Sequence, residues 1–262
     1  MPLPPPASPT RIPCKCCGGE AALFGLVDFH KNCERSRKLN LGLSGIPIYY
    51  HRCTNCGFIF TIAFDQFSDQ DFLDVIYNAE YALVDPDYAD IRPRNNAQFL
   101  ANLLSAFKET RILDYGGGNG KLAELLRSAG FTAVDTYDPF VSEFAAKPTD
   151  RYECIVSFET VEHSNRPRQT FEEINSLLRE DGVLLFSTLL QPANIGEIGV
   201  SWWYLAPRNG HVSLFNPAAL RAIVTPLGMK LGSFNDVLHV AHRSVPAFAR
   251  HFLLRGMGVP PM

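Results

Sequence analysis

Apolar runs alternate with amphipathic segments through the middle of the chain. Three short segments rich in β-branched or aromatic residues predict buried strands at 111–115, 131–139 and 153–158. The continuous apolar run 183–190 is too short to cross a bilayer and fits a strand buried on both faces. Residues 121–130 and 167–180 carry apolar side chains at helical spacing, and Asp181-Gly182 is expected to stop the second helix. This alternation predicts an α/β protein with a parallel sheet covered by helices.

The flanking segments extend this picture. Residues 71–77 and 94–107 predict helices before the sheet, and an apolar stripe on the second is expected to pack into the core. After residue 190 we expect a long loop, a helix beginning near Asn216-Pro217, and strands at 230–234 and 237–242 that form an antiparallel hairpin at one edge of the sheet. Only about a dozen residues, 140–151, separate the second strand from the third, which predicts a shortened opposite edge.

A glycine turn follows the first predicted strand and leads directly into a helix. Gly116, Gly118 and Gly120 let the backbone turn sharply and approach a ligand, while the free N–H groups of the next helix face the same crevice. Asp114 precedes this D-x-G-x-G-x-G turn and suits a cationic ligand group.

A second acid ends the next strand. Asp138 lies 24 residues after Asp114, where a carboxylate can accept both ribose hydroxyls of a nucleoside. Asp135 is the alternative, and we expect it to be an ordinary mid-strand surface residue.

From Arg111 to Thr188 the sequence resembles the class I S-adenosylmethionine-dependent methyltransferases, through the glycine turn, Tyr137-Asp138-Pro139 and the segment LLREDGVLLFST. The resemblance implies a Rossmann-like sheet, S-adenosyl-L-methionine as cofactor, and Asp114 near its amino-acid end. The family usually has a helix, a strand and a helix after the second strand, followed by an acid that contacts adenine. These are missing here, so adenine recognition is expected to depend on apolar contacts such as Phe140. The predicted cofactor-binding residues are Asp114, Gly116, Gly118, Gly120, Asp138, Phe140 and Glu159.

The segment after the third strand carries the candidate chemistry. Glu159, Glu162 and His163 would share one face of a helical turn. They follow the C-terminal end of a sheet strand, which is where open α/β sheets bind their ligands. The pattern resembles that of ubiquinone-pathway O-methyltransferases and small-RNA 2′-O-methyltransferases, in which such residues bind a divalent metal. The small-RNA enzymes add a second histidine from further along the chain, and His211 is its counterpart here. These four residues could hold Mg²⁺, Mn²⁺ or Zn²⁺. Alternatively, without metal, His163 or His211 would be the general base.

The loop that supplies His211 contains other candidates. Trp202, Trp203 and Tyr204 could stack on an apolar substrate or sugar face, or simply pack as a lid. Arg208 could pair with a substrate phosphate or carboxylate, or be solvated.

Two C-x-x-C-G knuckles near the N-terminus predict a structural zinc site. Four thiolates complete a tetrahedral shell, and a glycine after each pair lets backbone amides approach the sulfur atoms. Cys16 is a substitute ligand, His51 an outside candidate, and a disulfide the alternative; Cys33 and Cys154 are expected to be lone thiols. The predicted ligands are Cys14, Cys17, Cys53 and Cys56.

Composition fits a soluble cytoplasmic enzyme. Of the 262 residues, 46% are hydrophobic and 19% charged, and the net charge of −3 argues against non-specific binding to nucleic acid. We expect no membrane association. The predicted organisation is a flexible proline-rich lead (1–12), a zinc-binding module (13–65), a helical linker and first helix (66–107), the methyltransferase domain (108–245) and a C-terminal tail (246–262).

A zinc module, a tyrosine-containing linker and a methyltransferase turn in this order resemble bacterial methyltransferases of sugar, glycan or natural-product pathways. The resemblance implies methyl transfer to a small-molecule or sugar acceptor, and we expect an oxygen atom to receive the methyl group. The alternatives are C- or N-methyl transfer without a catalytic metal, a nicotinamide oxidoreductase, which the glycine spacing fits poorly, and a non-catalytic zinc-bearing interaction module.

Overall fold

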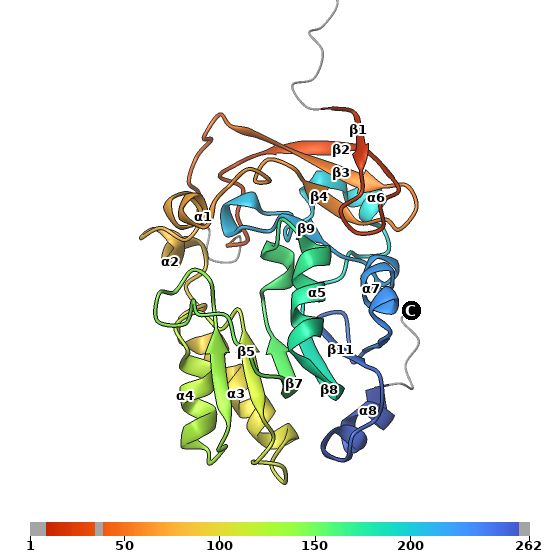
Figure 1. Cartoon of the computed structure of the whole chain (residues 1–262). Coiled ribbons are helices and arrows are strands. Elements are labelled where there is room, and N and C mark those ends of the chain that lie inside the picture. The colour runs from red at the N-terminus through yellow and green to blue at the C-terminus, as the bar shows by residue number, and fades with distance from the viewer. Residues whose placement is uncertain (1–8, 35–38, 257–262) are drawn as a thin grey trace, which may run out of the picture.

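The computed structural model describes residues 9–34 and 39–256 (Figure 1). Residues 1–8 of the predicted lead, residues 35–38 and residues 257–262 of the predicted tail lie outside the described residues. Within the described ranges, no helix combines the length and apolar character needed to span a membrane.

The larger of two sheets has six strands in the order β10-β11-β8-β7-β5-β6. Strands β5 to β8 are parallel, β11 is antiparallel to β8, and β10 is antiparallel to β11. The predicted α/β class, the antiparallel hairpin at one edge and the shortened opposite edge, which ends at β6, are confirmed. The strands are β5 (Ile112–Tyr115), β6 (Val134–Tyr137), β7 (Tyr152–Ser157), β8 (Leu178–Ser187), β10 (Lys230–Ser233) and β11 (Leu238–His242).

Helices cover both faces of this sheet because its strands alternate two sets of apolar side chains. Leu185 on β8 packs in the same cluster as residues of α3 (Ile91–Leu103), α4 (Lys121–Ser128) and α8 (Arg250–Gly256). Its neighbour Leu184 packs in the opposite cluster with residues of α5 (Pro167–Leu177) and α7 (Pro217–Val224).

Several predicted boundaries are wrong. The helix predicted to reach residue 180 ends at Leu177, and Leu178 already pairs with Tyr152 in the sheet. The register shifts before the next pair, so Asp181-Gly182 belongs to an irregular stretch of β8 and does not stop a helix. The predicted helix 94–107 runs instead from 91 to 103. The predicted helix 71–77 is α1 (Asp69–Val75), because Ser68 and Asp71 form a capping box that fixes its start.

The smaller sheet is antiparallel, with the strand order β1-β2-β3-β4-β9. Its first four strands come from the N-terminal region, but its last is a two-residue strand from far along the chain, paired through Ile59 with Leu214 and Phe60 with Ser213. Figure 1 shows this sheet as a layer above the larger one. The strands are β1 (Arg11–Pro13), β2 (Glu20–Asp28), β3 (Pro47–Cys53), β4 (Ile59–Thr61) and β9 (Ser213–Leu214).

One aromatic cluster joins the two layers. Phe58, which precedes β4, packs on Phe215 with ring centroids 5.0 Å apart, and Phe215 lies 6.3 Å from Phe171 of α5. All three rings are fully buried. The N-terminal sheet and the larger sheet therefore share a core.

We predict that Leu214→Ala lowers the free energy of unfolding by about 2–5 kcal/mol, because the fully buried side chain leaves a cavity where the two layers meet. Because the core is shared, urea unfolding followed by tryptophan fluorescence and by circular dichroism should still give a single coincident transition. The control Val237→Ala, at a position 42% exposed, should change stability by no more than about 0.5 kcal/mol. Separate transitions for the two layers would contradict the shared core.

Candidate functional site

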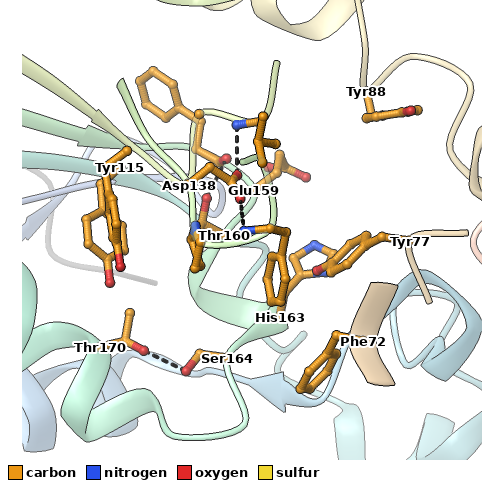
Figure 2. Close-up of a pocket in the computed structure, with 18 of the residues that line it drawn as sticks. Phe72, Tyr77, Tyr88, Tyr115, Asp138, Glu159, Thr160, His163, Ser164 and Thr170 are labelled. Carbon is orange, nitrogen blue, oxygen red and sulfur yellow. Dashed lines mark hydrogen bonds between the residues drawn. The ribbon is translucent and has the colours of Figure 1, made fainter. Parts of the chain in front are cut away.

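A cavity of about 940 Å³ lies where β5, β6 and β7 end. Its walls come from the glycine turn after β5, the ends of β6 and β7, and the start of α5. The helical segment between β4 and β5 in the sequence also contributes. Figure 2 shows Tyr77 and Phe72 facing His163 on one side of the cavity and Tyr115 facing Thr170 on another. Of the predicted site residues, those that line it are Asp114, Gly116, Gly118, Asp138, Phe140, Glu159 and His163.

The glycine turn depends on its glycines for backbone conformation and close packing. Gly116 has a φ of 76°, and a Cβ atom there would lie 2.4 Å from the side chain of Thr160. Gly118 has a φ of 55° and donates its N–H to the Asp138 carboxylate at 2.8 Å. Gly120 has a φ of 71° and precedes α4, where a Cβ atom would lie 2.7 Å from the ring of Phe144, and it lies outside the cavity lining.

Asp138 is fixed at the cavity edge. Its second oxygen accepts a hydrogen bond from Phe140 N at 2.9 Å, so both carboxylate oxygens have backbone donors. Asp135, the alternative, is exposed on β6, accepts a hydrogen bond from Tyr152 at 2.9 Å and does not line the cavity. The preference for Asp138 in the cavity and Asp135 on the surface agrees with this placement.

Asp114 is 3% exposed, and its Oδ2 atom has no hydrogen-bond partner among the described residues. Burial, and then the nearby charge of Asp138, raise the pKa of the Asp114 carboxyl group to about 7. A buried carboxylate oxygen without a donor is costly, and a ligand that brings a donor or a positive charge would relieve that cost.

The predicted helical arrangement of the acids after β7 is wrong. Only η1 (Val161–His163), a single 3₁₀ turn, is helical, and Glu159 lies before it with a φ of 51°. Among the described residues, Glu159 is the only non-glycine residue in this left-handed region, a conformation that is common at functional sites. Its carboxylate accepts a hydrogen bond from Ser187 Oγ at 2.8 Å. Glu159 and His163 therefore line the cavity, while Glu162 is fully buried away from the lining.

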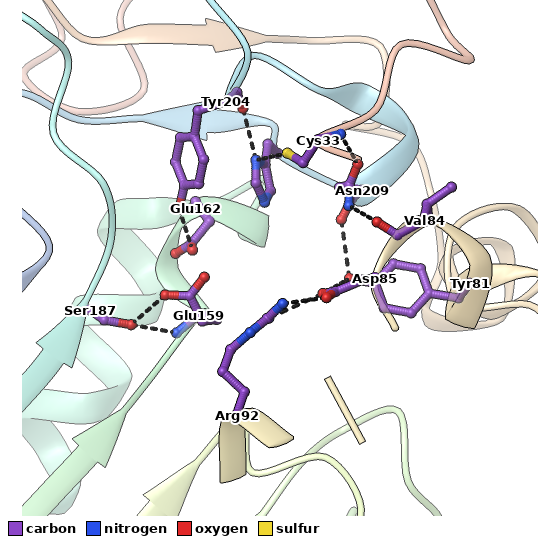
Figure 3. Close-up of polar contacts among 11 residues, drawn as sticks. Cys33, Tyr81, Val84, Asp85, Arg92, Glu159, Glu162, Ser187, Tyr204 and Asn209 are labelled. Carbon is purple, nitrogen blue, oxygen red and sulfur yellow. Dashed lines mark hydrogen bonds and ion pairs between the residues drawn. The ribbon is translucent and has the colours of Figure 1, made fainter. Parts of the chain in front are cut away.

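Glu162, His163 and His211 form a compact group whose candidate ligand atoms all lie within 4.8 Å of one another, and Glu159 is not part of it. The centroids of the two imidazole rings are 5.0 Å apart, so the loop after β8 brings His211 against His163. Tyr204 donates a hydrogen bond to Glu162 at 2.6 Å and its carbonyl lies 2.8 Å from His211 Nδ1. Figure 3 shows Tyr204 above Glu162, with Glu159 held by Ser187.

Burial sets the charge of this group. It raises the pKa of Glu162 to about 8, helped by the negative charge of Glu159, and it lowers the pKa of His211 to about 4. Burial and the neighbouring His211 lower the pKa of His163 well below its usual range. Glu162 Oε2 and His163 Nδ1 have no hydrogen-bond partner in the described part of the chain. Neutral imidazoles and unpaired buried atoms suit either a proton acceptor or a divalent metal.

The sequence did not reveal an ion pair at the cavity. Arg92 of α3 pairs with both oxygens of Asp85, and both residues line the cavity. Tyr81 donates to Asp85 at 3.3 Å, and Asn209 Nδ2 donates to Val84 O at 2.8 Å, which joins this segment to the His211 loop (Figure 3). The helix predicted from the sequence began at residue 94, after Arg92, so nothing in the sequence indicated that Arg92 would line the cavity.

Other predicted residues of that loop have structural positions. Arg208 is 3% exposed and donates to Ile76 O and Asn78, so it is neither solvated nor in the cavity lining. Trp202 is buried and Trp203 is 44% exposed, and neither lines the cavity. Cys33 is part of the loop's surroundings, with its sulfur 3.7 Å from His211 Nδ1.

The four knuckle cysteines form a second compact group, with all sulfur atoms within 4.8 Å of one another. Cys14 and Cys56 are 3.7 Å apart and Cys17 and Cys53 are 3.5 Å apart, as free thiols. Backbone N–H groups point at the sulfur atoms, for example that of Cys16 at Cys14 Sγ. Cys16 instead donates its thiol to Ala219 O, and His51 lies against Pro9 O, so both alternative ligands are outside the group.

A family model described as a methyltransferase domain matches residues 88–231, which include the glycine turn, Asp138, Glu162 and His211. None of the curated protein sequences matches the chain significantly.

Several methyltransferases are among the solved structures to which the chain is similar. An O-methyltransferase family protein from Burkholderia thailandensis is 16% identical with a TM-score of 0.49, over 68% of this chain and 63% of that protein, so the chain spans less than two thirds of its length. Magnesium protoporphyrin IX methyltransferase from Synechocystis, with bound S-adenosylhomocysteine, is 13% identical with a TM-score of 0.43, over 60% and 84%. A plantazolicin methyltransferase is 15% identical with a TM-score of 0.45, over 66% and 92%.

We predict that Asp114→Asn stabilises the ligand-free protein at pH 8. The folded-state pKa of about 7 lies above the ordinary value of 3.8, so the folded state retains a proton that the unfolded chain has released, and stability falls as pH rises between these values. The variant cannot ionise, and its free energy of unfolding should exceed that of the wild type by up to about 4 kcal/mol at pH 8 and by much less at pH 4.5. Urea unfolding at both pH values tests this, with Asp135→Asn as an exposed control. A constant difference across the two pH values would refute it.

Proposed function

Because the chain belongs to the methyltransferase domain family, we propose that it transfers a methyl group from S-adenosyl-L-methionine to a hydroxyl oxygen of a small-molecule or sugar acceptor. The observation that carries this proposal is His163, an uncharged imidazole in the wall of the cavity that also contains the glycine turn and Asp138. A neutral imidazole beside an acceptor hydroxyl can remove its proton.

The cavity residues fit each part of the cofactor. Asp138 would accept the two ribose hydroxyls, and Phe140 offers an apolar face to the base. Asp114, whose buried oxygen lacks a donor, and Glu159 would hold the ammonium group, while the Arg92 guanidinium would bind the carboxylate. The bound cofactor supplies a methyl group already activated by the sulfonium.

The protein's remaining tasks are alignment, exclusion of water and removal of one proton. Phe72, Tyr77 and Phe140 form contiguous aromatic contacts along the cavity wall. The ring centroids of Phe72 and Phe140 are 5.8 Å apart, and those of Tyr77 and Phe140 are 5.1 Å apart. Tyr77 also lies against His163, at 6.3 Å between ring centroids. This apolar wall would shield the acceptor oxygen and keep His163 neutral until it takes the proton.

A divalent metal at Glu162, His163 and His211 is the second candidate for activation of the hydroxyl. The specific observation in its favour is the proximity of the ligand atoms, two of which are buried without partners. Mg²⁺, Mn²⁺ or Zn²⁺ bound there would lower the pKa of the acceptor hydroxyl. Because Glu159 lies outside this group, we propose three protein ligands and not the four that the sequence suggests.

We further propose that Cys14, Cys17, Cys53 and Cys56 bind a structural zinc. The sulfur separations and the backbone N–H groups directed at the sulfur atoms suit four thiolates around one ion. All four positions would be filled by protein, so this ion would hold the N-terminal sheet and take no part in chemistry.

The cofactor site is tested by comparing the binding of S-adenosylhomocysteine with that of a shorter ligand that lacks its amino-acid group. Arg92→Gln should weaken binding of S-adenosylhomocysteine by about ten- to a hundredfold, through loss of a charged hydrogen bond. It should leave 5′-methylthioadenosine, which lacks the amino-acid group, nearly unaffected. Asp138→Asn should weaken both ligands, because both carry the ribose.

Calorimetric titration measures these affinities. Arg94→Gln is the matched control, since Arg94 lies two residues away on the same helix and pairs with Asp90 on the surface. If folded wild-type protein binds neither ligand, the methyltransferase proposal fails and a non-catalytic zinc-bearing module replaces it.

Elemental analysis separates the metal proposals. We expect one zinc per chain in the wild type, lost in Cys14→Ser/Cys53→Ser. Under the metal-assisted candidate, a second ion is present after incubation with Mn²⁺ and is lost in Glu162→Gln, with the zinc retained. Glu124→Gln, on the surface of α4, is the control. A wild type that binds zinc alone would exclude the second candidate and leave His163 as the base.

A further inference from the structure

The segment that carries Glu162 and His163 is held by the N-terminal sheet and by β9. We call residues 162–166 the reaction loop. Glu162 O accepts a hydrogen bond from Val212 N at 3.0 Å, and Ser164 O accepts one from Ser213 Oγ at 2.6 Å. Asn165 Nδ2 donates to Phe64 O at 2.9 Å. These three contacts hold the loop to β9 and to the residues that adjoin β4 and β9, and His163 to Arg166 of the loop line the cavity.

The fourth contact comes from the first cysteine knuckle. Lys15 lies between Cys14 and Cys16, and its ammonium donates to Asn165 O at 3.1 Å and to Thr61 O at 2.8 Å. It also forms an ion pair with Asp65. The Lys15 side chain is only 13% exposed, and its three N–H donors have three partners: Thr61 and Asp65 at and just after the end of β4, and Asn165 on the reaction loop.

The position of this ammonium depends on the knuckle fold. Gly18 N and Cys14 N close the knuckle turn through hydrogen bonds to Cys14 O and Gly19 O, which directs the intervening Lys15 toward the reaction loop. The ammonium also lies 5.6 Å from the centroid of the Phe60 ring. On the same knuckle, Cys16 O accepts a hydrogen bond from Arg168 of α5 at 2.8 Å. The knuckle therefore contacts both the reaction loop and the helix that follows it.

We propose that Lys15 is a positioning residue for the reaction: the first cysteine knuckle places its ammonium against Asn165 O and so holds the reaction loop where His163 lines the cavity. The inference rests on the proposed function, which gives the loop its role. It assigns the cysteine module a part in setting the geometry of the site, beyond stabilising the fold.

The test compares Lys15→Met with Lys15→Arg, which keeps a cation at that position. Hydrogen–deuterium exchange should be faster by about tenfold or more in peptides covering 160–166 of Lys15→Met, and unchanged in peptides covering β5 and β7. Lys15→Arg should restore most of the protection. Asp65→Asn provides a second variant that weakens the same contact, and Lys230→Met, at an exposed site, is the control.

A binding measurement on the same samples distinguishes positioning from packing. Because Thr160, His163 and Asn165 line the cavity, Lys15→Met should weaken S-adenosylhomocysteine binding by about three- to tenfold while zinc content stays at the wild-type level. Unchanged loop exchange, exchange that rises throughout the molecule, or unchanged affinity would each overturn the proposal. Failure of the wild type to bind S-adenosylhomocysteine would overturn the proposed function instead, and would leave the exchange result to decide whether Lys15 holds the loop.

Discussion

The pairing of β4 with the two-residue strand β9 is the constraint on which the arrangement of the site depends. This short ladder holds residues 213–214 against the N-terminal sheet, and His211 lies two residues before it. Val212, between them, donates to Glu162 O and accepts from Thr61 N. One backbone position therefore joins the small sheet to the segment after β7, and the two histidines meet where two strands far apart in the sequence pair.

The site concentrates groups that are unfavourable in a ligand-free protein. Asp114 and Glu162 are acids in surroundings that disfavour their charge, and His163 is an imidazole that cannot readily become protonated. Glu159 adds a left-handed backbone conformation. Such departures from local preference concentrate at sites selected for binding or catalysis, while the apolar clusters on both faces of the larger sheet provide the compensating stability.

The sequence predicted local and periodic features well. The α/β class, the sheet hairpin, the short edge after β6 and the meeting of four knuckle cysteines follow from apolar periodicity, segment length and cysteine spacing. It failed where long-range pairing overrides local preference: Leu178 joins the sheet instead of continuing α5, and Glu159 departs from helical geometry. The strand β9 is two residues long and has no sequence signal. Lys15 was missed because its partners lie in segments remote from its own motif. Arg92 was missed because the helix was predicted to begin at residue 94, after Arg92, although its partner Asp85 lies only seven residues earlier.

The short edge at β6 also makes the larger sheet a poor template for an added strand. An edge strand exposes unpaired backbone groups on its outer side, and a long apolar edge invites another strand to add. Here the edge strand has only four residues, and its second residue is the exposed Asp135. Asp150 and Arg111 lie around it, so the edge carries a mixed cluster of charges that would have to lose water before a second sheet could dock. Asp135, the alternative to Asp138 for the cavity, thus contributes to an edge whose charges disfavour the addition of another strand.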